Sequence, residues 1–173
     1  MKYITFILIF IFLPIGLHAY PSKTSKVTAI RQLENGSYKD LEIFNNLYLQ
    51  CHSSTEALQL MKELDELIEQ PSCIPLNHIA AASAISFLGD HSLALQQLKE
   101  LSTSLSSQTN YIRGEYYVML GKISYRSENP KTAIGHIETG IDYLEKTREL
   151  EAQQIAYTNL GLAYGAIKQH ETA

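Results

Sequence analysis

The chain has 173 residues, of which 45% are hydrophobic and 18% are charged, and its formal net charge is −4. This is the composition of one folded globular domain of ordinary size, and it is too apolar for a disordered chain. The 14 Lys and Arg residues form no basic stripe along the sequence, which argues against a nucleic-acid partner.

The N-terminus has the pattern of a secretory signal. Lys2 precedes an almost unbroken apolar run of 14 residues, from Ile4 to Leu17, and the small residue Ala19 follows soon after. Such a run is short for a helix that crosses a bilayer. Residues 1–19 are therefore predicted to be a cleaved signal peptide, with an uncleaved signal anchor as the alternative, and the protein is predicted to be exported.

Beyond the signal, the apolar residues recur with a helical period and no long segment alternates with period two. The sequence predicts an all-α domain over residues 37–173, preceded by a linker over residues 20–36. Four helix starts are expected from their capping residues. They are Ser53 with Glu56 three residues later, Asp90, Asn129 before Pro130, and His170-Glu171.

Small residues recur at fixed distances from these helix starts. Just inside the four helices stand Ala57, Ala94, Ala133 and Ala173, at spacings of 37, 39 and 40 residues. Twelve residues earlier stand Asn45, Ala82, Gly121 and Gly161. In the last copy, Tyr157, Leu160 and Tyr164 surround the small residue. Four copies in one register indicate a repeated pair of helices.

This pattern resembles the tetratricopeptide repeat (TPR) family, in a long-spacing bacterial form, because the spacing exceeds the usual value of about 34 residues. The resemblance implies an antiparallel helix-hairpin solenoid with three full repeats and a truncated fourth. An unrelated helical bundle is the alternative. The residues expected to pack the repeats together are Ala57, Ala82, Ala94, Gly121, Ala133, Gly161, Tyr164 and Ala173.

The fourth unit is expected to hold a first helix over about residues 150–167 and only the first residues of its second helix. An array of this kind normally ends with a polar capping helix. The sequence is therefore expected to be an N-terminal fragment of a longer protein, with a naturally frayed terminus as the alternative.

No cofactor, metal or catalytic group is expected within these residues. The expected second helix of the first unit separates Cys51 from Cys73, so the two thiols are predicted to be free, and they are also too far apart to share a zinc ion with His52 and His78. No phosphate-binding loop or nucleophile elbow is complete.

The resemblance places a ligand-binding surface on the inner face of the first helices. Its candidate residues are Asn46, Ser83, Lys122, Tyr125 and Arg126. The members of the family that clamp a terminal carboxylate use a Lys where this chain has Glu42, so that clamp is not expected. Lys122 and Arg126, four residues apart, could meet an acidic ligand group, and a solvated pair of cations is the alternative.

Together these features predict an exported, non-enzymatic module that binds a protein or peptide partner, in the periplasm or on the periplasmic face of the inner membrane. The resemblance suggests the sensory part of a longer signal-transduction protein. A transmembrane segment and an enzymatic output domain would then follow residue 173, and membrane attachment would come only through that segment. The alternative function is that of a free-standing periplasmic scaffold or assembly protein.

Overall fold

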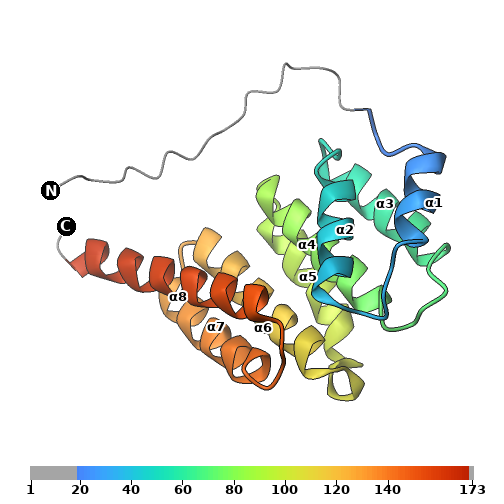
Figure 1. Cartoon of the computed structure of the whole chain (residues 1–173). Coiled ribbons are helices and arrows are strands. Elements are labelled where there is room, and N and C mark those ends of the chain that lie inside the picture. Colours follow the sequence, from blue (N-terminus) through green and yellow to red (C-terminus); the bar gives the residue numbers. More distant parts are fainter. Residues whose placement is uncertain (1–18, 172–173) are drawn as a thin grey trace, which may run out of the picture.

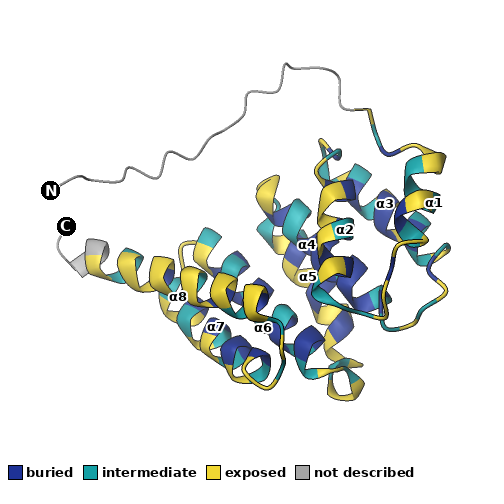
Figure 2. Ribbon diagram, viewed as in Figure 1, coloured by how far each residue is buried: buried dark blue, intermediate teal, exposed yellow. Residues whose placement is uncertain are grey.

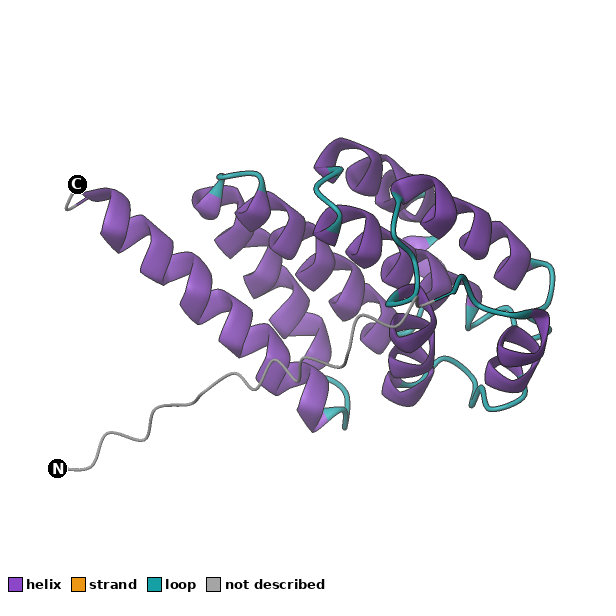
Figure 3. Cartoon of the chain, turned by 90° about the horizontal axis from the view of Figure 1, so that it is seen from above, coloured by secondary structure: helices purple, strands orange, loops and turns teal. Residues whose placement is uncertain are grey.

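The structure is a computed structural model that describes residues 19–171, with side chains through residue 168. Every regular element in this range is helical, which confirms the predicted all-α class (Figures 1 and 3). The elements are α1 (Lys23–Ile30), α2 (Tyr38–Tyr48), α3 (Ser54–Asp65), α4 (Ile74–Phe87), α5 (His91–Ser102), the 3₁₀ turn η1 (Leu105–Ser107), α6 (Asn110–Arg126), α7 (Pro130–Leu144) and α8 (Leu150–Glu171). Residues 1–18 of the predicted signal sequence, and Ala173, lie outside the described residues.

The helices pack in sequential pairs. Each of α2, α4 and α6 contacts the next even-numbered helix, so that α2, α4, α6 and α8 lie in one row. On the other side of this row, α3 packs on α4, α5 packs on α4 and α6, and α7 packs on α6 and α8 (Figure 1). The exposed surfaces of the even-numbered helices thus belong to one side of the molecule.

The capping residues begin three of the helices where the sequence predicts them. The side chains of Ser53, Asp90 and Asn129 accept hydrogen bonds from the first turns of α3, α5 and α7. The helix predicted to start at His170 is wrong, because α8 continues unbroken to Glu171. Residues 166–169, directly before His170, contain no Pro, Asn or Gly, so nothing there terminates a helix.

The segment expected to be a linker contains α1. Tyr20 donates a hydrogen bond from its hydroxyl to the Glu63 carboxylate of α3 at 3.2 Å, and Lys26 of α1 forms an ion pair with the same carboxylate. Helix α1 also contacts α2. These contacts attach the start of the described chain to the first helices of the domain.

Two helices of the row end in the same way. Gly89 after α4 has φ +95°, and the N–H of Asp90 donates to the carbonyl of Ile85. Glu128, 39 residues later, has φ 58° after α6, and the N–H of Asn129 donates to the carbonyl of Ser124. Both are left-handed C-caps, a conformation that glycine adopts without strain and glutamate does not.

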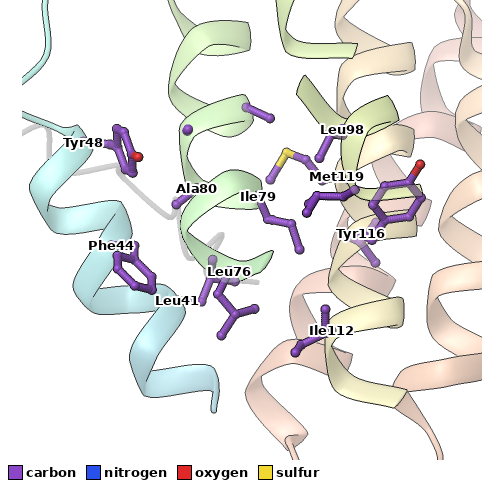
Figure 4. Packing of buried hydrophobic residues seen from close by; sticks show 14 of the residues in the cluster. Leu41, Phe44, Tyr48, Leu76, Ile79, Ala80, Leu98, Ile112, Tyr116 and Met119 are labelled. Carbon is purple, nitrogen blue, oxygen red and sulfur yellow. The ribbon is translucent and has the colours of Figure 1, made fainter. Parts of the chain in front are cut away.

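A single hydrophobic core runs between this row and the helices α3, α5 and α7 on its other side. Leu76 and Ala80 of α4 lie toward Leu41, Phe44 and Tyr48 of α2, whereas Ile79 lies on the opposite side of α4, toward Ile112, Tyr116 and Met119 of α6 (Figure 4). The buried positions face inward along each helix, and the outward faces are exposed (Figure 2). Four of the expected packing residues, Ala57, Ala82, Ala94 and Ala133, are fully buried.

Glycines bring α6 and α7 into close contact. A Cβ atom on Gly121 would lie 2.4 Å from Cγ1 of Ile137 and 3.0 Å from the carbonyl oxygen of Ala133. Gly114 lies seven residues before Gly121 on α6, and Gly140 lies seven residues after Ala133 on α7. A Cβ atom on Gly114 would lie 2.6 Å from Leu144, and one on Gly140 would lie 2.7 Å from Val118. The packing role predicted for Gly121 therefore has a direct geometric cause. Gly161 and Tyr164 on α8 are instead exposed.

Candidate functional site

A groove of about 470 Å³ opens on the side of the even-numbered helices. It lies where the C-terminal ends of α2, α4 and α6 meet. Its lining residues are Asn45, Tyr48, Leu49, Cys51, His52, Ala80, Ser83, Ala84, Phe87, Leu88 and Arg126. The small side chains of Ala80, Ser83 and Ala84 leave the space open along α4.

Two large apolar side chains of the groove are left to solvent. Leu49, directly after α2, is 75% exposed, and Phe87 at the end of α4 is 78% exposed. Contiguous exposed apolar surface beside a concavity is typical of an interaction site. The groove can therefore accept an apolar group between these side chains.

Arg126 supplies the cation of the groove. Its guanidinium lies 5.9 Å from the centre of the Phe87 ring, and Nη1 donates to Oγ of Ser86 at 3.3 Å. The Ser86 hydroxyl also lies 3.1 Å from Nδ1 of His91. These contacts hold the arginine at the edge of the groove, with its charge beside the apolar surface.

A smaller pocket of about 120 Å³ adjoins the groove and shares Arg126 with it. Lys122 and Tyr125 of α6 line this pocket together with Asn159 and Leu162 of α8. Neither the groove nor this pocket has a carboxylate in its lining. Among the described residues, Lys122 and Arg126 take part in no ion pair.

The two cations of α6 are half-buried, so they are not a fully solvated pair. Burial lowers the pKa of Lys122, and the positive charge of Arg126 lowers it further, while Glu115 acts in the opposite direction. Like charges that are withdrawn from water in this way attract an anion. The site is therefore electropositive as well as apolar.

The structure brings together four of the five residues predicted for the inner face. Ser83 and Arg126 line the groove, and Lys122 and Tyr125 line the adjoining pocket. Asn46 lies apart, because it faces α1 in a different pocket. Its neighbour Asn45 occupies the groove instead, so the predicted register on α2 is off by one residue.

A buried polar network supports the wall of the groove. The Tyr48 hydroxyl donates to Oδ1 of Asn77 at 2.7 Å, and Nδ2 of Asn77 donates to the Met61 carbonyl and to the Asp65 carboxylate. His78 Nε2 lies 2.8 Å from the other carboxylate oxygen of Asp65. The network fixes Tyr48 between α3 and α4, since Asn77 is fully buried.

Both cysteines are free and buried. Cys51 lines the groove, where burial and the nearby charge of Glu56 raise its pKa to about 11. Its thiol is therefore protonated at neutral pH and is a poor nucleophile. Within the described residues, no group of three His, Cys, Asp or Glu side chains is arranged to hold a metal ion.

The opposite end of the same side is acidic. Glu42 and Tyr38 lie one and two turns before Asn45 on α2, and they line a pocket with Glu149 and Glu151 at the start of α8. The pKa of Tyr38 is raised by burial and by the charges of Glu42, Glu115 and Glu151. The side formed by the even-numbered helices is thus negative at their N-terminal ends and positive near Lys122 and Arg126.

Leu49 and Phe87 are the groove residues that sequence reasoning missed. Leu49 directly follows the amphipathic helix α2, and Phe87 ends α4, which is apolar on all sides, so the sequence assigns both residues to the core. Only their exposure in the folded chain shows that they face a ligand surface.

No family model, curated protein or solved structure matches this chain. Between residues 19 and 171, none of the helices has the length and hydropathy that a membrane span requires.

Proposed function

We propose that this protein is an exported, non-enzymatic peptide-binding module of the TPR type, and that the groove between α2, α4 and α6 is its binding site. The observation that carries the proposal is the groove itself, with Leu49 and Phe87 exposed and Arg126 beside them. A peptide segment would place an apolar side chain there and an acidic group near Lys122 and Arg126.

The packing of the helices supports the TPR assignment. Helices α4 and α6 each contact the helices before and after them in sequence, and α2, α4 and α6 each contact the next even-numbered helix, as in stacked helix hairpins; α2 packs on α4 rather than on α3. Gly121 on α6 faces Ala133 and Ile137 on α7, and these are the small and bulky positions on which the resemblance rests. Extended surfaces made by such stacks are suited to protein ligands.

The electropositive end favours an acidic peptide over a neutral one. A carboxylate placed between Lys122 and Arg126 would relieve the repulsion between two half-buried cations. The carboxylates of Glu42, Glu149 and Glu151 would repel an acidic group at the other end of the surface. The ligand is therefore expected to bind in one direction.

A random peptide library selected on the immobilised chain tests the proposal. We expect the enriched peptides to combine a bulky apolar residue with Asp, Glu or a free C-terminus. Ala84→Trp fills the groove and should weaken their binding at least about tenfold, whereas Leu95→Trp, on the exposed surface of α5, should leave it unchanged. Enriched peptides that bind both variants equally would exclude the groove as the site.

Export is tested separately. Residues 1–30 fused to alkaline phosphatase, which is active only outside the cytoplasm, should give phosphatase activity, and deletion of the apolar run should abolish it. If the fusion with residues 1–30 intact gives no phosphatase activity, export is contradicted.

We further propose that the module is the sensory part of a longer signalling protein, with a free-standing periplasmic scaffold as the alternative. The native protein in its source cells distinguishes the two. A membrane-bound species much heavier than 19.5 kDa supports the first proposal, and a soluble species near that mass supports the second.

A further inference from the structure

The acidic pocket at the N-terminal ends of α2 and α8 carries an excess of negative charge. Four carboxylates and one ammonium group line its volume of about 360 Å³. The ammonium group belongs to Lys39, which pairs with Glu34 at 3.8 Å. Among the described residues, Glu42, Glu149 and Glu151 form no ion pair. Three carboxylates therefore line the pocket without a counter-charge.

The partial positive charge of helix N-termini accounts for only some of these carboxylates. It stabilises an acidic side chain in the first turn of a helix, as for Glu151 of α8. Glu42 and Glu115 lie beyond the first turns of α2 and α6. Burial raises the pKa of Glu115, and the charge of Glu149 raises it further, whereas Lys122 acts in the opposite direction. Carboxylates that repel one another in this way favour a positively charged ligand.

A buried hydroxyl beside these carboxylates has no hydrogen-bond partner. Tyr111 of α6 is 5% exposed, and its hydroxyl forms no hydrogen bond within the part of the chain that the structure describes. Burial raises the pKa of Tyr111, and the charges of Glu115 and Glu149 raise it further. Tyr38 also acts on this pKa, and both Tyr38 and Glu149 line the pocket. The hydroxyl therefore lies at the inner wall of the pocket.

The unpaired hydroxyl of Tyr111 should cost stability, because it loses its hydrogen bonds to water and gains none within the chain. A phenylalanine would fill nearly the same space without this cost. The tyrosine has a physical role if its oxygen accepts a hydrogen bond from a ligand.

We propose that the acidic pocket binds a protonated primary amine, which belongs either to a free diamine or polyamine or to a lysine side chain of a bound peptide. An alkylammonium group has three N–H donors and no acceptor, so it can donate to Glu42, Glu149 and the Tyr111 oxygen together. Tyr38, which is half-buried, has to turn aside to admit the ammonium group, and its ring can then contact the cation. A metal ion suits the pocket less well, because no three His, Cys, Asp or Glu side chains of the described chain are arranged to hold one.

The pocket is separate from the peptide groove, and the proposal does not depend on that groove. Glu42 and Leu49 are seven residues apart along the direction of α2, which corresponds to about 10 Å in a helix. An extended peptide covers this distance in about three residues. A peptide that occupies both sites would therefore carry its lysine about three residues from the apolar side chain in the groove.

An amide NMR titration of the whole chain with 1,5-diaminopentane at pH 7 tests the proposal. We expect saturable shifts of residues 37–42 and 149–151 with a Kd of about 1 mM or lower, and none with the uncharged 1,5-pentanediol. Glu42→Gln combined with Glu149→Gln should weaken binding at least about tenfold. Glu66→Gln combined with Glu100→Gln removes the same charge from exposed positions and should leave binding within about twofold.

Tyr111→Phe separates ligand binding from folding. It should raise the melting temperature of the free chain, because the unpaired hydroxyl is gone, and it should weaken diamine binding at least about threefold. A lower melting temperature would show that the hydroxyl stabilises the free chain, and this result would overturn the proposal. Binding that is unchanged in Tyr111→Phe, or in the double variant of Glu42 and Glu149, would overturn it as well.

A lysine-containing peptide that binds the chain, and the same peptide with Lys→Gln, identify the source of the amine. Weaker binding of the Gln peptide, with a difference that disappears in the double variant of Glu42 and Glu149, assigns the pocket to a peptide lysine even if the diamine does not bind. Saturable binding of the diamine with equal binding of both peptides assigns it to a free amine. Neither effect would overturn the proposal outright. Ala84→Trp, which fills the groove, should leave diamine binding unchanged, so a failure of the groove and a failure of this pocket are distinguishable.

Discussion

Adding one methyl group at Gly121 should have the opposite effect on stability from adding it at Gly161. Both are helical glycines at equivalent positions of α6 and α8. In a helix interior, Gly→Ala alone stabilises by about 0.5–1 kcal/mol. The surroundings of the added Cβ atom decide whether this gain survives.

At Gly121 the new Cβ atom would lie 2.4 Å from Cγ1 of Ile137, more than 1 Å closer than the optimal separation of roughly 3.5–4.0 Å between carbon atoms. The carbonyl oxygen of Ala133, at 3.0 Å, prevents a simple shift of α7. Overpacking of this kind costs about 1–3 kcal/mol. After the gain in helix propensity, Gly121→Ala should destabilise the fold by about 1–2 kcal/mol.

At Gly161 no atom lies within 4 Å, so Gly161→Ala should stabilise by about 0.5–1 kcal/mol. Urea unfolding followed by circular dichroism at 222 nm measures both variants against the unmodified chain. In an Ile137→Ala background, the cost of Gly121→Ala should shrink, because the principal clash has been removed. A Gly121→Ala chain as stable as the Gly161→Ala chain would refute the close packing of α6 on α7.

Four further predictions concern single side chains. Glu128→Gly should raise the free energy of unfolding by about 1 kcal/mol in urea titrations, because φ at this position is 58°. Asn77→Ala should lower it by about 2–4 kcal/mol, because the Tyr48 hydroxyl and its other buried partners lose their hydrogen bonds. Burial raises the pKa of Glu115 from 4.5 to about 7, so the native state holds this proton more tightly than the unfolded state. The free energy of unfolding of the unmodified chain should therefore fall as pH rises from 4.5 to 7. Glu115→Gln should not show this fall, so the difference in stability between the two chains should change steadily in favour of the variant over that range. Cys51 should react with a thiol reagent at pH 7 only after denaturant is added, since its pKa of about 11 leaves it protonated and the side chain is buried.

The regular parts of the fold could be predicted because their causes are local. Ser53, Asp90 and Asn129 begin helices through hydrogen bonds within four residues. The recurrence of small residues likewise located Gly121 and Ala133 at the contact between α6 and α7. Where the same spacing extended to His170, no cap and no helix breaker supported it, and α8 ran through that position.

The first repeat shows how the spacing argument weakens. Asn45 stands where the later units have Ala82 and Gly121, and it lies at the groove. Helices α2 and α3 each pack on α4 more extensively than on one another. Asn45 is larger than Ala82 or Gly121, which is consistent with the wide spacing of α2 and α3. This spacing leaves open the surface on which the groove lies.

The groove itself could be predicted only in part. The register of the TPR resemblance predicted Lys122 and Arg126 on the inner face, but their half-burial depends on neighbouring helices. The hydrophobicity of Leu49 and Phe87 in the sequence is the same whether these side chains are buried in the core or exposed on a binding surface. Their role depends on where α2 and α4 end relative to one another in space, which periodicity does not encode.

Methyl NMR of the chain with one selected peptide tests the central claim most directly. The methyl groups of Ala80 and Ala84 line the groove, whereas those of Ala152 and Ala156 lie in the α7–α8 packing. If the groove is the binding site, the resonances of the first pair shift on titration and those of the second pair stay in place. Shifts confined to α8, with Ala80 and Ala84 unchanged at saturation, would contradict the proposed function.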